Sequence, residues 1–179
     1  MEEDSEVLLV PHERIGAIIG KAGQTKKDIE SKTETKITVD SKEGEVEVCR
    51  RGEPIKYFRA LRVLKAIARG FSPENAYRLL NDEMVFELIE LQDELGKNES
   101  RMKAKKGRVI GSQGAAREEI EQDTGAKISV YGKTIGIIGK DEEVDKAKRA
   151  VDMLLSGAAH TSVFRSLRKK EGSGEKFEL

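Results

Sequence analysis

Two stretches of the chain decide its fold: GAIIGKAGQTKKDIESKTETKITVD at residues 16–40 and GRVIGSQGAAREEIEQDTGAKISVY at residues 107–131. A shift of 91 residues aligns them without gaps, and ten of the 25 positions are identical. Repeats that stack into solenoids have periods of roughly 20 to 50 residues. Two copies at this larger spacing therefore indicate a duplicated domain, and the chain is expected to form two domains of one fold.

Hydrophobic periodicity gives the order of elements in each copy, because alternating apolar residues favour strands and three-to-four spacing favours helices. In the first copy we expect a strand at 7–10, a short helix at 14–19, a tight turn at 20–23, a helix at 24–32, strands at 35–40 and 45–49, and a helix at 53–69. The second copy is expected from residue 99, with strands at 127–131 and 134–138 joined by a two-residue turn, and a helix at 141–155.

The segment between the copies, residues 72–98, is strongly acidic. Residues 72–96 hold seven acids and one arginine. Ser72 followed by Pro73 is a typical helix start, so a helical connector is expected. Its apolar residues need burial, either between the two domains or by a protein partner, and we expect packing within the chain.

Composition excludes several classes of protein. The 33 basic and 33 acidic residues cancel, so any affinity for nucleic acid must come from local basic patches. Aromatic residues are 4% of the chain, which disfavours an aromatic stacking platform. Cys49 is the only cysteine, and His12 and His160 are the only histidines. We therefore expect no disulfide framework, metal site, cofactor or catalytic constellation, and we expect a monomeric, cytoplasmic protein without a membrane segment.

IIGKAG and VIGSQG, each between two short helices and before two strands and a long helix, resemble the GxxG signature of KH domains. The resemblance implies an α+β fold: two type I KH domains of order β-α-α-β-β-α, each with a three-stranded antiparallel sheet and three helices. The boundaries expected are residues 5–71 for the first domain, 72–98 for the connector, 99–156 for the second domain and 157–179 for the tail.

In KH domains the GxxG loop clamps about four nucleotides through their backbone. Glycine lets the RNA backbone approach closely, and the N–H groups that open the following helix point at phosphate. Candidate RNA-binding residues in the first copy are Gly20, Lys21, Ala22, Gly23, Lys26 and Lys27. Those in the second copy are Gly111, Ser112, Gln113 and Gly114, with Lys103, Lys105, Lys106, Arg108 and Arg117 around the loop. The groove, or the core beneath it, is expected from Ile18, Ile19, Ile37, Val109, Ile110 and Ile128.

Charge favours the second copy as the stronger RNA binder. Residues 97–117 hold seven basic residues and one acid, a net charge of +6 around the second loop. A second basic stripe follows one edge of the helix at 53–69 and comprises Lys56, Arg59, Arg62, Lys65 and Arg69. This stripe is interpreted as a solvated face or as an auxiliary contact with RNA or protein.

Finer details resemble the two-KH-domain pre-ribosomal RNA processing factors, which include the partner of the Nob-one endonuclease and its archaeal counterparts. These details are Lys26 and Arg117 three places after the second loop glycines, the length, the acidic connector and the GAAHTSVFRSL segment at 157–167. Because GKAG is intact in the first copy, the archaeal version is expected. The resemblance implies a small-subunit assembly factor that binds single-stranded ribosomal RNA near its 3′ end and positions the maturation endonuclease. Translation initiation or assembly factors are further possible partners. A KH adaptor in RNA decay or translation control, and a KH scaffold without RNA binding, stay open as alternatives.

The tail is interpreted in three ways: a docking element, an extension packed on its own domain, or a disordered segment. His160, Val163, Phe164 and Leu167 share one face of a possible helix. The Gly- and Ser-containing composition of residues 171–174 favours disorder for the last residues.

Overall fold

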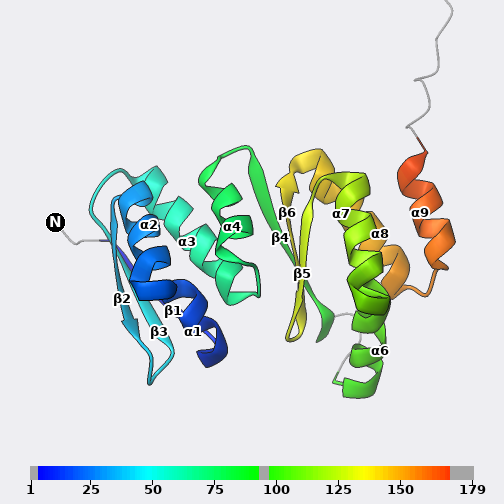
Figure 1. Ribbon diagram of the computed structural model, residues 1–179, viewed down its shortest axis with the longest axis horizontal. Coiled ribbons are helices and arrows are strands. Elements are labelled where there is room, and N and C mark those ends of the chain that lie inside the picture. Colours follow the sequence, from blue (N-terminus) through cyan, green and yellow to red (C-terminus); the bar gives the residue numbers. More distant parts are fainter. Residues whose placement is uncertain (1–3, 93–96, 170–179) are drawn as a thin grey trace, which may run out of the picture.

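The computed structural model describes residues 4–92 and 97–169. It contains two three-stranded antiparallel sheets, each with helices against one face, and the second sheet is covered on its other face as well (Figure 1). The layers follow one another as sheet, helices, sheet, helices, with a terminal helix outside the last layer. The expected α+β fold of two KH units is confirmed.

The first unit has the predicted order of elements. Its members are β1 (Ser5–Leu9), α1 (His12–Ile19), the 3-10 turn η1 (Lys21–Gly23), α2 (Gln24–Thr33), β2 (Thr35–Asp40), β3 (Glu45–Arg50) and α3 (Pro54–Ala68). The strand order is β1-β3-β2, so β2 is an edge strand. Alternation buries Val46 and Val48 of β3 beneath the helices and leaves Glu45 and Glu47 exposed, as expected for a sheet with one wet face.

The second unit begins with a strand that the sequence analysis placed in the connector. After α4 (Pro73–Ala76) and the 3-10 turn η2 (Tyr77–Leu80), residues Met84–Glu90 form β4, which pairs with β6 from Met84↔Lys140 to Glu90↔Thr134. The helix expected across 72–98 is therefore wrong for most of that segment. Ser72 does cap α4, since its hydroxyl accepts a hydrogen bond from the Asn75 N–H at 3.3 Å. Asp93 and Glu94 of the acidic run lie outside the described residues.

The remaining elements of the second unit are α6 (Glu99–Ile110), the 3-10 turn η3 (Ser112–Gly114), α7 (Ala115–Thr124), β5 (Lys127–Tyr131), β6 (Thr134–Lys140) and α8 (Asp141–Leu155). The sheet order is β4-β6-β5, which repeats that of the first unit. Gly20 follows the end of β1 by 11 residues, whereas Gly111 follows the end of β4 by 21. The offset of 91 residues therefore does not align β1 with β4, and the repeat gave no signal for β4.

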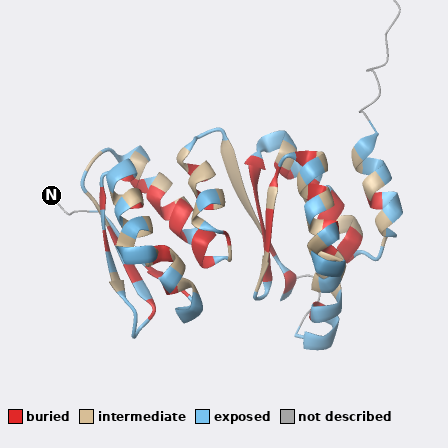
Figure 2. Cartoon of the chain, in the orientation of Figure 1, coloured by how far each residue is buried: buried red, intermediate tan, exposed pale blue. Residues whose placement is uncertain are grey.

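Burial of the second sheet on both faces joins the two units. Every residue of β6 from Thr134 to Gly139 is buried (Figure 2). Ile135 and Ile137 lie in the core under α8, whereas Ile138 lies in the core of the first unit. Phe71, just after α3, meets Phe86 of β4 edge to face, with ring centroids 6.0 Å apart. The apolar residues of the connector are thus packed within the chain, as expected.

Ion pairs explain the basic stripe on α3. Arg59 makes two hydrogen bonds to Asp82, of 2.8 and 2.5 Å, and Arg62 donates to the carbonyl of Met84. Lys65 lies 3.0 Å from Glu6, and Lys56 pairs with Glu34. Four cations of the stripe are therefore paired: Lys65 with β1, Lys56 with the residue before β2, and Arg59 and Arg62 with residues 82 and 84 at the start of β4.

The tail forms α9 (His160–Arg168), which packs on its own unit. Val163 is fully buried in the second core, and Phe164 and Leu167 pack against that core while partly exposed. Arg168 pairs with Glu119 and lies 3.3 Å from Asp123 of α7. Residues 160–168 therefore pack on their own domain, as a helix separate from α8. The disorder expected at 171–174 falls outside the described residues.

Candidate RNA interface

The two GxxG loops have the same backbone conformation. Gly20 and Gly111 both have φ 74° and ψ 177°, and the second glycines, Gly23 and Gly114, have φ 74° and 79°. Between them, Ala22 and Gln113 adopt φ of 53° and 54°, a region that non-glycine residues rarely occupy. The strained turn therefore recurs in both copies, although the two inner residues differ.

The first glycine of each loop is required by space as well as by φ. A Cβ on Gly111 would lie 2.6 Å from the backbone nitrogen of Ala116, and one on Gly20 would lie 2.8 Å from that of Thr25. At Gly23 a Cβ would meet nothing within 4 Å. The first glycine therefore lets α2 or α7 start immediately beside the end of α1 or α6.

The two inner residues of each loop are exposed, and no side chain caps the helix that follows. Lys21, Ala22, Ser112 and Gln113 lie on the surface. Neither α2 nor α7 has a side-chain hydrogen bond at its N-cap glycine. Their first N–H groups are positioned to donate to a phosphate, and the helix dipole favours negative charge there.

The predicted groove residues divide into two sets. Ile18, Ile37, Val109 and Ile128 are at most 3% exposed and belong to the cores. Ile19 and Ile110, the last residues before the loops, are partly exposed. Of the six residues, these two alone have side chains at the surface beside the GxxG turn.

A glutamate ties each loop helix to the neighbouring edge strand, a contact that the sequence analysis missed. Glu30 Oε1 accepts the Ile37 N–H at 2.7 Å, and Glu121 Oε1 accepts the Ile128 N–H at 2.8 Å. Both glutamates are identical positions of the 91-residue repeat, which was the available signal. The bond sets the spacing between α2 and β2, and between α7 and β5.

The predicted basic residues differ in exposure and in whether another group of the protein binds their charged end. Lys21, Lys27 and Lys103 are exposed, and Lys105 is partly exposed. Lys26 lies 3.4 Å from Glu30, and Lys106 donates to the carbonyl of Gly132 at 2.9 Å.

Arg108 is placed differently from the expectation. Its guanidinium turns away from the loop, donating to the Leu154 carbonyl at 3.0 Å and to the Ala158 carbonyl. Arg14 does the same in the first unit, with bonds of 2.9 Å to Ile67 and 2.8 Å to Phe71. Arg14 thus donates to carbonyls at the C-terminal end of α3, and Arg108 to carbonyls at the C-terminal end of α8.

Arg117 is the remaining predicted cation. It lies beside the second loop, where its Nη2 is 3.7 Å from the Cβ position of Gly114. Its Nε is buried without a hydrogen-bond partner among the described residues.

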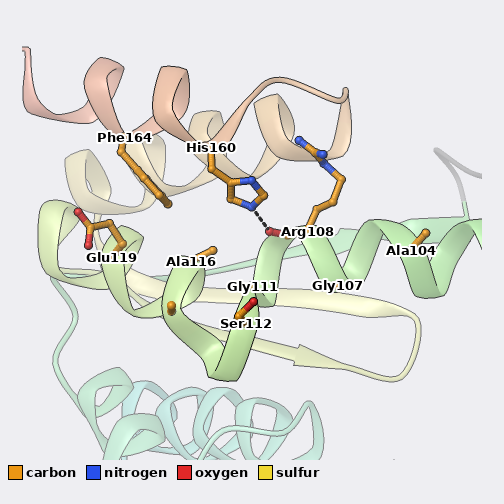
Figure 3. A pocket seen from close by; sticks show the side chains of 10 residues that line it. Ala104, Gly107, Arg108, Gly111, Ser112, Ala116, Glu119, His160 and Phe164 are labelled. Atoms are coloured by element: carbon orange, nitrogen blue, oxygen red, sulfur yellow. Dashed lines mark hydrogen bonds between the residues drawn. The ribbon is translucent and has the colours of Figure 1, made fainter.

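A cavity of about 540 Å³ adjoins the second loop (Figure 3). Its walls come from α6, the loop, α7 and α9, and its lining residues are Ala104, Gly107, Arg108, Gly111, Ser112, Ala115, Ala116, Glu119, His160 and Phe164. The rings of His160 and Phe164 hang from α9 toward the loop, and His160 Nε2 lies 2.8 Å from the Arg108 carbonyl oxygen. Among the described residues no cluster of three or more His, Cys, Asp or Glu side chains could hold a metal, and no described helix is long and apolar enough to cross a membrane.

Known proteins match both units. A KH-domain profile matches residues 5–65, and a profile for eukaryotic-type (type I) KH domains matches residues 85–172. A KH domain-containing protein of Methanocaldococcus jannaschii is 40% identical over 172 residues, which are 94% of this chain and 75% of that protein. The pre-rRNA-processing protein pno1 of Emericella nidulans is 29% identical over 59% of this chain and 42% of its own length.

Solved structures agree. A crystal structure of Dim2p from Pyrococcus horikoshii and one of an a/eIF2alpha-aDim2p-rRNA complex from the same organism match with 42% sequence identity, each with a TM-score of 0.86. They cover 94% and 93% of this chain, and 100% and 93% of their own matched chains. The chain therefore belongs to the family of two-KH-domain proteins that includes archaeal Dim2p and the pre-rRNA-processing protein pno1.

Proposed function

We propose that this protein is an RNA-binding ribosome biogenesis factor that grips single-stranded small-subunit ribosomal RNA near its 3′ end through its GxxG loops. The observation that carries the proposal is the recurrence of one strained, exposed loop before an uncapped helix in both units. A turn that keeps a non-glycine residue at positive φ costs about 1–3 kcal/mol for that residue. Backbone strain of this kind is concentrated at functional sites, and its recurrence favours a functional role for both loops.

The family supports the choice of ribosomal RNA. A relative is named as a pre-rRNA-processing protein, and a solved neighbour is described in complex with rRNA. These properties belong to those proteins, and we propose the same class of RNA for this chain. The protein acts in this proposal as a cytoplasmic, monomeric chaperone that presents the RNA to a maturation endonuclease. The same neighbour also contains a/eIF2alpha, which favours a translation initiation factor as a further protein partner.

The second loop is the stronger grip in this proposal. Lys103 is exposed and Lys105 partly exposed on α6, the helix that leads into that loop, and cations near a phosphate-binding loop strengthen binding in a salt-dependent way. In the first unit Lys21 supplies one cation inside the loop, while Lys26 shares its charge with Glu30.

Equilibrium binding to a synthetic RNA with the sequence of the small-subunit rRNA 3′ end tests the proposal. The double variant Ser112→Asp with Gln113→Asp places two carboxylates against the phosphates, so we expect the dissociation constant to rise by about 100-fold or more, since each lost or repelled charged contact costs about 1.5–3 kcal/mol. The exposed loop residues leave the core untouched, and the melting temperature checks that the fold holds.

The matched control is Lys21→Asp with Ala22→Asp in the first loop, for which we expect a smaller loss. An equal or larger loss in the first unit would contradict the ranking of the two loops. Unchanged binding in both double variants would reject the loops as the RNA grip.

A further inference from the structure

The cavity beside the second loop is distinct from the groove between α7 and β5. One of its sides is formed by α9, a helix that the KH arrangement of elements does not include. Gly111 and Ser112 of the loop form one end of the lining, and His160 and Phe164 of α9 form the roof (Figure 3). The cavity is therefore continuous with the loop.

The two units differ in the aromatic residue that follows the long helix. Gly70 and Gly157 end the long helices with the same φ of +96°, and an aromatic residue follows each glycine by seven positions, Tyr77 and Phe164. The ring of Tyr77 lies 5.4 Å from Lys32 Nζ of α2. Tyr77 thus has a charged partner on α2.

In the second unit the residue aligned with Thr25 of α2 is Ala116, whose side chain has no polar group, and Phe164 has no hydroxyl. Two more small residues, Ala104 and Gly107, line the same cavity. The ring of Phe164 keeps part of its surface exposed. A cavity of about 540 Å³ is in the size range of sites for small planar ligands.

A second cavity of about 480 Å³ shares Phe164 with the first and adds Thr161, Arg165, Arg168 and Lys169. Arg168 is paired with Glu119 and Asp123. Arg165 and Lys169 are exposed, and neither has an ion pair with another described residue. A partly exposed aromatic ring thus lies between a phosphate-binding loop and two available cations.

We propose that α9 extends the RNA-binding surface of the second unit: the base of one unpaired nucleotide enters this cavity and stacks on Phe164, while a neighbouring phosphate meets Arg165 and Lys169. This inference rests on the proposed function, because the strand reaches the cavity from the GxxG loop. Alternation of stacking rings and cations is the general means of holding single-stranded nucleic acid. An acidic or purely apolar peptide would leave either the loop N–H groups or the ring unused.

Two variants test the proposal with a short and a long RNA. Phe164→Leu removes the stacking surface and retains apolar packing against the core, and Arg165→Glu reverses an exposed charge. The short RNA has about four nucleotides, the number that a KH loop clamps, and the long one has about twice as many. We expect each variant to weaken binding of the long RNA by about tenfold and to leave the short RNA almost unaffected.

Matched controls are Tyr77→Leu, the aromatic counterpart in the first unit, and Arg149→Glu, an exposed position on α8 outside both cavities. Photocrosslinking with 5-iodouridine at successive positions of the long RNA gives a direct readout. We expect one position beyond the loop-bound segment to crosslink to Phe164.

The outcomes separate this inference from the proposed function. Loss of binding with Ser112→Asp and Gln113→Asp, together with no effect of Phe164→Leu and Arg165→Glu on the long RNA, overturns the α9 site alone. No effect of any loop or α9 variant overturns both. Variants of α9 that retain RNA binding but lose a protein partner would assign the cavity to that partner and reject the base.

Discussion

At the residue scale, two repeated glycines near the second loop have different roles. Gly111 is required by the close approach of Ala116, whereas Gly107, one turn earlier in α6, would place a Cβ in open space. Both are glycines at repeat positions, so the sequence treats them alike. Only the local geometry separates a glycine that closes a turn from one in a helix.

We expect Gly111→Ala to destabilise the protein by about 1–3 kcal/mol, because alanine resists positive φ and its Cβ meets backbone that cannot move cheaply. Gly107→Ala should instead stabilise it by about 0.5–1 kcal/mol, since glycine is unfavourable inside a helix. Chemical denaturation of both variants measures the difference. Equal effects, or a loss at Gly107, would contradict the distinct roles.

The sequence predicted the residues of the turn and its special conformation, because glycine spacing is a local signal. It did not predict the direction of the Arg108 side chain, since the carbonyls of Leu154 and Ala158 come from a helix end more than 40 residues away. Position near a loop in the sequence does not fix the direction of a side chain. The Arg108 guanidinium instead satisfies carbonyl groups at the end of α8 that need a hydrogen-bond donor.

At the element scale, the connector shows where periodicity failed. Residues Met84–Glu90 are all partly or fully buried except Glu90, because one side of β4 faces the first unit and the other faces α8. A strand buried on both faces has no alternation to detect, and the helix start at Ser72 favoured a helix across the segment in the sequence analysis. Glu87, an acid within this buried strand, pairs with Lys148 of α8 at 2.6 Å.

The link between Arg59 and Asp82 makes a prediction about pH. The hydrogen bonds from Arg59 hold the pKa of Asp82 below its ordinary value. A lowered folded-state pKa contributes stability above the unfolded pKa, about 3.9, and that contribution is lost as the pH falls through the folded pKa. Asp82→Asn should lower the melting temperature slightly at pH 7.

The same difference in melting temperature should begin to shrink below about pH 4, where the unfolded state takes up the proton, and should disappear once the pH has fallen through the lowered pKa of Asp82 in the folded protein. Added salt should reduce it too, because the pair is exposed. A difference that stays constant from pH 7 to pH 3 would mean that the substitution acts through packing or hydrogen bonding and not through charge.

Helix α9 makes a second prediction at this scale. Val163 is fully buried against the second core, so Val163→Ala should cost about 2 kcal/mol through lost methyl burial. Ser162→Ala, an exposed neighbour on the same helix, is the control and should change little. Thermal or chemical unfolding gives the comparison, and equal stability of the two variants would mean that α9 is not docked in solution.

At the scale of the whole molecule, the second sheet (β4-β6-β5) contributes buried residues to both hydrophobic cores. Ser129 donates to the carbonyl of Arg69 at 2.9 Å, and a Cβ on Gly136 would lie 2.7 Å from the ring of Phe71. The duplication was evident from the sequence, and it implied two similar units. Their stacking was not evident, because it depends on which face of β6 each isoleucine occupies.

Because the units share this interface, we expect a single cooperative transition in calorimetry. Gly136→Val should push Phe71 out of place, lower the melting temperature and broaden or split the transition. Two well-separated transitions in the unaltered protein would show that the units unfold independently and would contradict the shared core.

The central claim is that the whole protein grips ribosomal RNA through its second GxxG loop, and crosslinking followed by sequencing tests it most directly. The protein and the Ser112→Asp, Gln113→Asp variant are crosslinked to RNA in cells of a related archaeon, and the bound RNA is sequenced. We predict that sequences from the 3′ end of the small-subunit rRNA accumulate with the unaltered protein and fall sharply with the variant. Crosslinks spread over messenger RNAs, or an unchanged pattern in the variant, would contradict the account.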